Sequence, residues 1–132
     1  MFLGVDHIVI SVPDMEAGLE QYQTIFGREV SRQGEPAGAG FLTAHFEFAE
    51  TTVELVQPTN DSGPVARHVE RGGGMYLLAM RVDDLSATLS ELREHGVQLI
   101  GDPGEGNEVT GQVFVHPRSA GGVLMQLVEA SD

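Results

Sequence analysis

Apolar and polar residues alternate along residues 3–12, which predicts a strand with one wholly aliphatic face. A helix is predicted from Asp14 to about Phe26, because Asp14 can cap its N-terminus, apolar residues recur at helical spacing and Gly27 supplies a stop signal. The pattern then predicts a short strand, a loop rich in Gly, Pro and Ala, and the two strands of a hairpin, at 28–32, 34–40, 41–48 and 51–58.

The second half of the chain repeats this pattern. When the sequence is shifted by 70 residues, Val12 and Asp14 correspond to Val82 and Asp84, and the helical positions that follow also match. The pattern predicts a strand, a helix, a strand, a glycine-rich loop and two strands, at 74–82, 84–95, 97–101, 101–111, 112–116 and 122–129.

We therefore expect a single α+β domain made of two βαβββ modules. The first module covers 1–58 and the second covers 74–132, and the linker at 59–73 should contain a short helix that Pro64 opens and Gly72 ends. If helices cover one face of each four-stranded half-sheet, the opposite faces must be buried against each other or line a pocket between the halves.

Composition describes a globular chain. With 132 residues and 41% apolar content, the chain can bury one core. No apolar run approaches the roughly 18–20 residues that span a bilayer, and the N-terminus lacks the pattern of a signal peptide, so we expect no membrane partner and a cytoplasmic location. Because cysteine is absent, any metal must bind to His, Asp, Glu or Gln side chains.

The formal charge of -13 makes nucleic acid an improbable partner, because phosphate binding needs clustered basic residues and the chain has only 7. Lysine is absent, which excludes Schiff-base chemistry. A small molecule is the expected partner, and an anionic one would have to meet local arginines.

Strand alternation places His7 and Glu54 on the face that the helices leave uncovered. If the hairpin turns at residues 49–50, its ladder puts His45 opposite Glu54. The counterparts of His7 and Glu54 in the second module are Leu77 and Gln126. An acid in the middle of an apolar strand is costly to bury unpaired, so Glu54 should have a partner, a metal or a ligand.

Other polar residues share the predicted pocket or lie outside it. Thr43 and Thr52 belong to its walls, and Arg81 has the same parity: it could bind a carboxylate or phosphate, or be a solvated strand end. The glycine-rich loop at 101–111 lacks the spacing of a phosphate-binding loop and is interpreted as a flexible pocket lid. Three further histidines are expected to be structural or inert: His68 and His95 on surface helices, and His116 at a turn before Pro117.

The chain resembles the vicinal oxygen chelate superfamily, which includes glyoxalases, bleomycin resistance proteins and dioxygenases, and within it the branch of methylmalonyl-CoA epimerase. The segments that carry the resemblance are Asp-His-Ile at 6–8, Val-Glu-Leu-Val-Gln-Pro at 53–58, the glycines at 72–74, Val-Asp-Asp-Leu at 82–85 and the His-Pro and Gly-Gly-Val-Leu-Met-Gln-Leu-Val-Glu segments within 116–129. The resemblance implies two modules that curl into a cup of curved mixed sheet, one divalent metal at the floor and a homodimer.

By the same resemblance, the four metal-ligand positions are His7, Glu54, Leu77 and Gln126. Leu77 stands where relatives have histidine and cannot coordinate a metal, and Gln126 stands where relatives have glutamate. The epimerases also have an acid in the loop before the third strand, where this chain has Gly38, with Glu35 as the nearest acid.

Three functions are compatible with these residues. The first is a lyase or isomerase of the epimerase-like type, in which His7, Glu54 and Gln126 hold Zn, Mn, Co, Ni or Fe beside a carbonyl substrate. The second is a metal-free enzyme in which Glu54, His45 and His7 move the proton, with Gln126, Leu77, Arg81, Thr43 and Thr52 binding the substrate. The third is a non-catalytic small-molecule binding protein of the bleomycin-resistance type.

Overall fold

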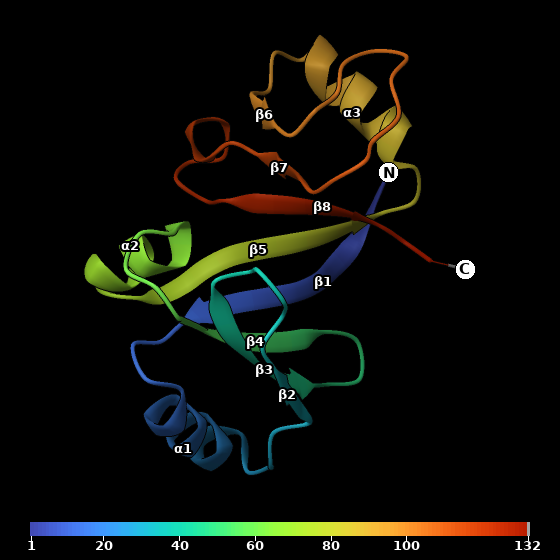
Figure 1. Ribbon diagram of the computed structural model, residues 1–132. Coiled ribbons are helices and arrows are strands. Elements are labelled where there is room, and N and C mark those ends of the chain that lie inside the picture. Colours follow the sequence, from blue (N-terminus) through green and yellow to red (C-terminus); the bar gives the residue numbers. More distant parts are fainter. Residues whose placement is uncertain (132) are drawn as a thin grey trace. The chain divides into compact units, whose positions relative to one another are not determined.

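The computed structural model describes residues 1–131 and contains eight strands and three α-helices in that range (Figure 1). In chain order the elements are β1 (Phe2–Ser11), α1 (Met15–Phe26), β2 (Arg32–Gly34), β3 (Phe41–Glu47), β4 (Thr52–Pro58), α2 (Pro64–Glu70), β5 (Gly74–Val82), α3 (Leu85–Glu94), β6 (Leu99–Ile100), β7 (Val113–Val115), a 3-10 helix (Pro117–Ser119) and β8 (Met125–Glu129). The predicted α+β class, with parallel and antiparallel strands mixed and the βαβββ order occurring twice, is confirmed.

The chain forms two compact units. His7–Tyr76 makes up one, called the N-terminal unit here, and Met1–Asp6 together with the chain from Leu77 onward makes up the other, the C-terminal unit. Strand β1 begins in the C-terminal unit and continues into the N-terminal unit. None of the helices in residues 1–131 has the length and apolar character needed to span a bilayer.

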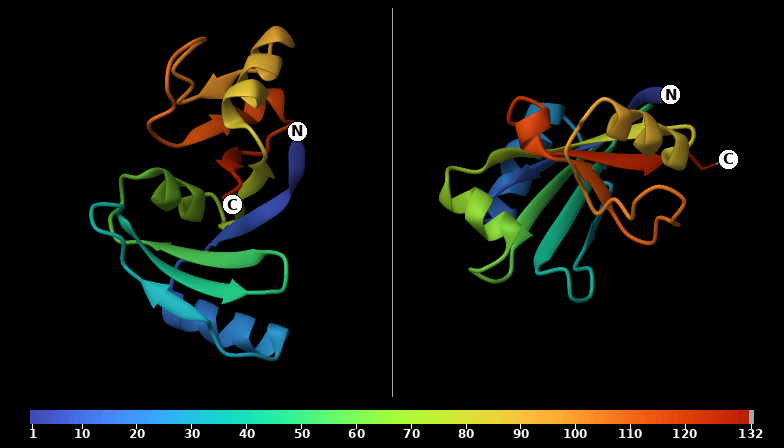
Figure 2. Two further views of the ribbon diagram at one scale, coloured as in Figure 1. Left: turned by 90° about the vertical axis from the view of Figure 1, so that its right-hand side faces the viewer. Right: turned by 90° about the horizontal axis from the view of Figure 1, so that it is seen from above.

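The N-terminal unit has the strand order β2-β3-β4-β1, in which β1 runs parallel to β4 and β3 is antiparallel to both neighbours. Helix α1 lies along one face of these strands (Figure 2) and buries its apolar side against Ala44, Phe46 and Leu55, which are inaccessible to solvent. Phe26, at the end of the helix, packs edge-on against Phe46 with 5.2 Å between ring centroids. Burial of these apolar side chains away from water is favourable, and it holds the helix on the sheet.

Local signals at the ends of α1 act as the sequence predicts. The Asp14 carboxylate accepts a hydrogen bond from the amide of Ala17, and Gly27 takes the left-handed conformation with φ of 64° that ends the helix. Asp84 caps α3 in the same way through the amide of Ala87. The two caps confirm that the repeat in the sequence is a repeat of structure.

The C-terminal unit has the strand order β5-β8-β7-β6, with β5 parallel to β8. Helix α3 packs against one face, where Leu89, Val113, Val115 and Leu127 form a buried cluster. Since strand residues alternate between faces, Gln126 points to the face opposite α3.

Helix α2 lies on the face of the N-terminal unit opposite α1 (Figure 2). Pro64 occupies its first turn, as predicted, and Val65 and Ala66 are buried. The sequence predicted this helix but not the surface that it covers. Helix α2 shields one end of the face that carries Glu54, around the buried residues Ser11 and Val56.

Several predicted strands are shorter than expected, and two of them, β2 and β8, begin three or four residues late. Strand β2 begins at Arg32 rather than near residue 28, because the amide of Val30 donates to the Gln23 side chain instead of joining the sheet. Strand β8 begins at Met125 because Gly121 and Gly122, both with positive φ, continue the turn after a 3-10 helix that the sequence analysis did not predict. His116 caps this helix by accepting from the amide of Arg118, which confirms its structural role.

Candidate active site

His45 and Glu54 form a hydrogen-bonded pair in the N-terminal unit. They are directly opposite each other on β3 and β4, and His45 Nε2 lies 3.0 Å from Glu54 Oε1. The hairpin turns where the sequence predicts, since the amide of Phe48 donates to the carbonyl of Thr51 at 2.9 Å. The predicted register is therefore confirmed, and so is the expectation that Glu54 has a partner.

This pair faces away from α1. Ala44, Phe46 and Leu55 flank it in sequence and point into the α1 core, so the alternation sends His45 and Glu54 to the other face. Only 13% of the His45 side chain and 17% of the Glu54 side chain are exposed to solvent. The carboxylate is therefore shielded from bulk water but can still be reached by a ligand.

The second ring nitrogen of His45 identifies its protonation. Nδ1 is buried and has no hydrogen-bond partner. A proton on Nδ1 would be a buried N–H donor without an acceptor, and burial of an unsatisfied donor costs free energy. We assign the neutral tautomer with the proton on Nε2, which donates to a Glu54 carboxylate.

The other predicted residues of this unit lie on the same face. Val9 is the β1 partner of Glu54, and His7, two residues earlier, pairs with Thr52 and shares the parity of Val9. Thr43 is buried, and its hydroxyl donates to the carbonyl of Gly34 at 3.3 Å. The structure therefore gives Thr43 a role in joining β3 to β2, while binding of substrate by Thr43 and Thr52 stays a prediction.

The remaining predicted residues belong to the C-terminal unit. Leu77, Arg81 and Gln126 share the face opposite α3, because Ala79 on β5 pairs with Gln126 on β8. Phe114 lies directly opposite Gln126 on this face. The sequence analysis missed Phe114, although the buried Val113 and Val115 on either side of it carry the alternation that would have placed it there.

The donor atoms in place do not make a metal centre within either unit. Among residues 1–131 no three His, Cys, Asp or Glu side chains are grouped so that they could hold an ion. Leu77 has no donor atom, and Glu54 Oε1 is already hydrogen bonded to His45. The predicted set of His7, Glu54 and Gln126 draws on both units and stays a prediction, so no step below is derived through a metal.

A second hydrogen-bonded histidine, His68, was not predicted. His68 on α2 is hydrogen bonded through Nδ1 to the Ser11 hydroxyl at 2.6 Å, and its ring packs edge-on against the Tyr76 ring, with 5.1 Å between centroids. Burial, followed by the positive charge of Arg71, lowers the pKa of His68 below its usual value. The expectation that His68 lies on the surface is wrong, because α2 turns this side chain inward and it is partly buried. His95 is exposed, as expected.

The lowered pKa of His68 predicts a pH dependence of stability. Between the lowered pKa in the folded protein and about 6.5 in the unfolded chain, the unfolded chain binds more protons, so neutral His68 stabilises the fold above this window and the contribution is lost as pH falls through it. We expect the difference in unfolding free energy between the wild type and His68→Gln to grow from about pH 5 to about pH 8. Urea unfolding at each pH measures it.

His95→Gln is the matched control, because it removes an exposed histidine at the end of α3 and leaves every other titrating group in place. Its difference from the wild type at each pH is the baseline against which the His68→Gln difference is compared. A His68→Gln difference that is flat, or that shrinks as pH rises, would contradict a lowered pKa of His68 in the folded protein.

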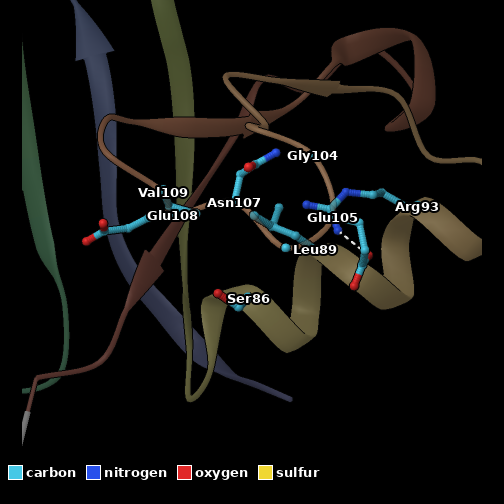
Figure 3. A pocket seen from close by; sticks show the side chains of 9 residues that line it. Ser86, Leu89, Arg93, Gly104, Glu105, Asn107, Glu108 and Val109 are labelled. Carbon is cyan, nitrogen blue, oxygen red and sulfur yellow. Dashed lines mark hydrogen bonds and ion pairs between the residues drawn. The ribbon is translucent and has the colours of Figure 1, made fainter.

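A pocket of about 420 Å³ lies between α3 and the glycine-rich loop (Figure 3). Ser86, Leu89 and Arg93 face it from the helix, and residues 104–109 line the other side. Arg93 anchors the loop, because it donates to the carboxylate of Asp102 and, at 2.7 Å, to Glu105. The predicted lid loop therefore borders a pocket, but this pocket is on the α3 side and contains none of the predicted site residues.

A further pocket, of about 430 Å³, lies beside the loop of residues 35–40 in the N-terminal unit. Glu35 and Gly38 both line it, together with Thr59 and Asn60. Gly38 is the position at which the resemblance expects an acid, and the structure confirms that no carboxylate stands there; Glu35, three residues earlier, is exposed.

Comparison with known proteins supports the resemblance drawn from the sequence. The ethylmalonyl-CoA/methylmalonyl-CoA epimerase of Cereibacter sphaeroides is 29% identical over 127 residues, which cover 93% of this chain and 95% of that protein. The crystal structure of methylmalonyl-CoA epimerase from Mycobacterium tuberculosis is similar with a TM-score of 0.79 and 32% identity, over 98% of this chain and 89% of that one.

A variant of Streptomyces coelicolor methylmalonyl-CoA epimerase in complex with 2-nitronate-propionyl-CoA is similar over the full length of both chains, with a TM-score of 0.80 and 26% identity. The model of the glyoxalase/bleomycin resistance protein/dioxygenase superfamily matches residues 6–114. This match covers the first module and the second as far as Phe114, which is more than half of the chain, so the protein belongs to the glyoxalase/bleomycin resistance protein/dioxygenase superfamily.

Proposed function

We propose that this protein is an epimerase-like isomerase that moves the proton on the carbon next to the thioester carbonyl of an acyl-CoA, with Glu54 as the general base. The observation that carries the proposal is the His45–Glu54 pair, in which a shielded carboxylate is held by a neutral imidazole on the face opposite α1. The similar proteins named methylmalonyl-CoA epimerase supply the class of substrate.

Glu54 takes the proton in this reaction. The C–H bond breaks, its electron pair moves into the bond toward the thioester carbonyl to give an enolate, and the carboxylate becomes a carboxylic acid. The Nε2–H of His45 occupies Oε1, so Oε2 is the oxygen left to receive the proton. The imidazolium form of His7, on the same sheet face, delivers a proton to the opposite side of the planar carbon, which gives the other epimer. Exchange with solvent then removes the proton from Glu54 and restores the one on His7.

Two positions at which the epimerases have an acid, 38 and 126, have none in this chain, which leaves Glu54 as the candidate base. Gln126 is an amide and Gly38 has no side chain, so neither can accept a proton from carbon. The role of base therefore passes to the carboxylate that remains on the uncovered face of the N-terminal unit. His45 is a positioning residue in this scheme, because it contacts Glu54 rather than the reacting carbon.

The loss of acids at positions 38 and 126 also favours a second candidate, a protein that binds an acyl-CoA or a related small molecule without turning it over. The ligand would bind to the same face of the N-terminal unit in this case. Only the fate of the proton separates the two functions.

Deuterium exchange tests the proposal. The purified protein, treated with a chelator, is incubated with methylmalonyl-CoA in deuterated buffer, and incorporation at the α-carbon is followed by mass spectrometry beside binding by calorimetry. We expect catalysed exchange that survives chelation. Exchange that returns only on adding Co, Mn, Ni or Zn would show that a metal is required, and binding without exchange would establish the non-catalytic protein instead.

A further inference from the structure

One basic side chain stands on the uncovered face of the C-terminal unit. Arg81, on β5, is the only Lys or Arg in the strands of this unit as the structure describes them. Apart from the carboxylate of Asp6 on β1, which lies beside Arg81, the side chains that strand alternation places on this face are apolar or neutral: Leu77, Ala79, Phe114, Gln126 and Val128. A guanidinium in such surroundings attracts anions more strongly than one in bulk water, because the surroundings screen its charge less.

The ion pair of Arg81 leaves room for a ligand. Its Nη1 lies 3.6 Å from Asp6 Oδ1, a separation longer than a direct hydrogen bond, and the two side chains are 36% and 31% exposed. A guanidinium has five N–H donors, so this loose contact engages only a fraction of them. The planar fork of the guanidinium can still form two parallel hydrogen bonds to a carboxylate.

The neighbour of Arg81 on this face suits an anion. Ala79 pairs with Gln126, and Arg81 follows Ala79 by two residues on the same face, so the amide and the guanidinium are diagonal neighbours on adjacent strands, about 7–8 Å apart at their backbones. A glutamate at position 126 would repel an anionic ligand, whereas the Gln126 amide can donate to it. In a chain of net charge -13, this combination of one cation and one neutral donor is a local exception.

We infer that Arg81 is the specificity-determining residue for a free carboxylate on the acyl group of the substrate. The inference rests on the proposed function for the identity of the acyl-CoA. Arg81 binds the carboxylate through its two outward N–H groups, Gln126 donates its amide to the same end of the acyl group, and Phe114 contacts the carbon chain.

The experiment compares two ligands that differ only in this carboxylate. Methylmalonyl-CoA and propionyl-CoA carry the same nucleotide phosphates, and their dissociation constants are measured by calorimetry. Methylmalonyl-CoA is used as the equilibrated mixture of its epimers, so that epimerisation causes no net change during the titration. We expect the wild type to prefer methylmalonyl-CoA, and Arg81→Gln to reduce this preference by about tenfold to a hundredfold, as expected for a charge-assisted hydrogen bond. Arg81→Lys keeps the charge but loses the fork, and should retain an intermediate preference.

Arg118→Gln is the matched control. It removes the same charge from an exposed site in the 3-10 helix and should leave the preference unchanged. An equal loss of affinity for both ligands in Arg81→Gln would assign Arg81 to the phosphates and overturn the inference, as would an unchanged preference. If Arg81→Gln alters the circular dichroism spectrum, the Arg81→Lys ratio decides: a value equal to the wild type overturns the inference.

The two proposals fail separately. If no exchange occurs but the carboxylate preference depends on Arg81, the proposed isomerase is wrong and the carboxylate site is right. If exchange occurs and the preference does not depend on Arg81, the isomerase holds and the assignment of Arg81 is wrong.

Discussion

Glu54→Gln is expected to lower the rate of α-proton exchange by about 10²–10⁴-fold, the usual contribution of a positioned general base. Glutamine is nearly the same size, and its amide oxygen can still accept the Nε2–H of His45, so the pair keeps its hydrogen bond. The amide cannot accept a proton from carbon. Deuterium incorporation under saturating methylmalonyl-CoA measures the loss, and the affinity for this ligand should change much less than the rate.

Glu50→Gln provides the matched control. It makes the same chemical change in the exposed turn of the same hairpin, four residues away, and should leave the rate within the error of the measurement. If Glu54→Gln exchanges protons as fast as the wild type while binding the ligand normally, another residue is the base and the proposed mechanism is wrong.

Gly101→Ala is expected to destabilise the protein strongly. Gly101 has φ of 80°, a conformation that residues with a side chain adopt reluctantly, and an added Cβ would lie 2.3 Å from the carbonyl oxygen of Gln112. Because the clash is with backbone, a strand must shift to relieve it. We expect the free energy of unfolding to fall by about 2–5 kcal/mol, the sum of backbone strain and overpacking.

Gly106→Ala separates the two causes. Gly106 has nearly the same φ, 79°, in the same loop, but nothing lies within 4 Å of an added Cβ. It should cost only the strain of about 1–2 kcal/mol. Urea unfolding of both variants gives the difference, and equal losses would show that the contact with Gln112 relaxes without cost.

Local patterns predicted the elements of this fold closely. The ends of α1 and α3 are determined by Asp14, Gly27 and Asp84, which act through hydrogen bonds and conformations within a few residues of themselves. The β3–β4 register was also predictable, because a slip by one residue would send His45 and Glu54 into the α1 core and expose Ala44 and Leu55.

Other features were beyond local patterns. Strand β2 is shorter than predicted because Gln23, in the preceding helix, takes the amide of Val30 from the sheet. The role of His68 depends on Ser11, 57 residues away in the sequence, which it meets only because α2 packs over the end of β1. Arg93 likewise holds the glycine-rich loop against α3 through carboxylates that the sequence does not mark as its partners.

The sequence by itself determined the duplicated βαβββ order, the caps, and the meeting of His45 with Glu54, because each of these follows from alternation and short-range hydrogen bonding. Tertiary structure decided the tautomer of His45, through the burial that leaves Nδ1 without a partner, and it decided the inward turn of His68 and the loose Asp6 contact of Arg81. The physical reason is that burial and long-range pairing depend on which surfaces pack together, and packing is a property of the folded chain rather than of any segment in it.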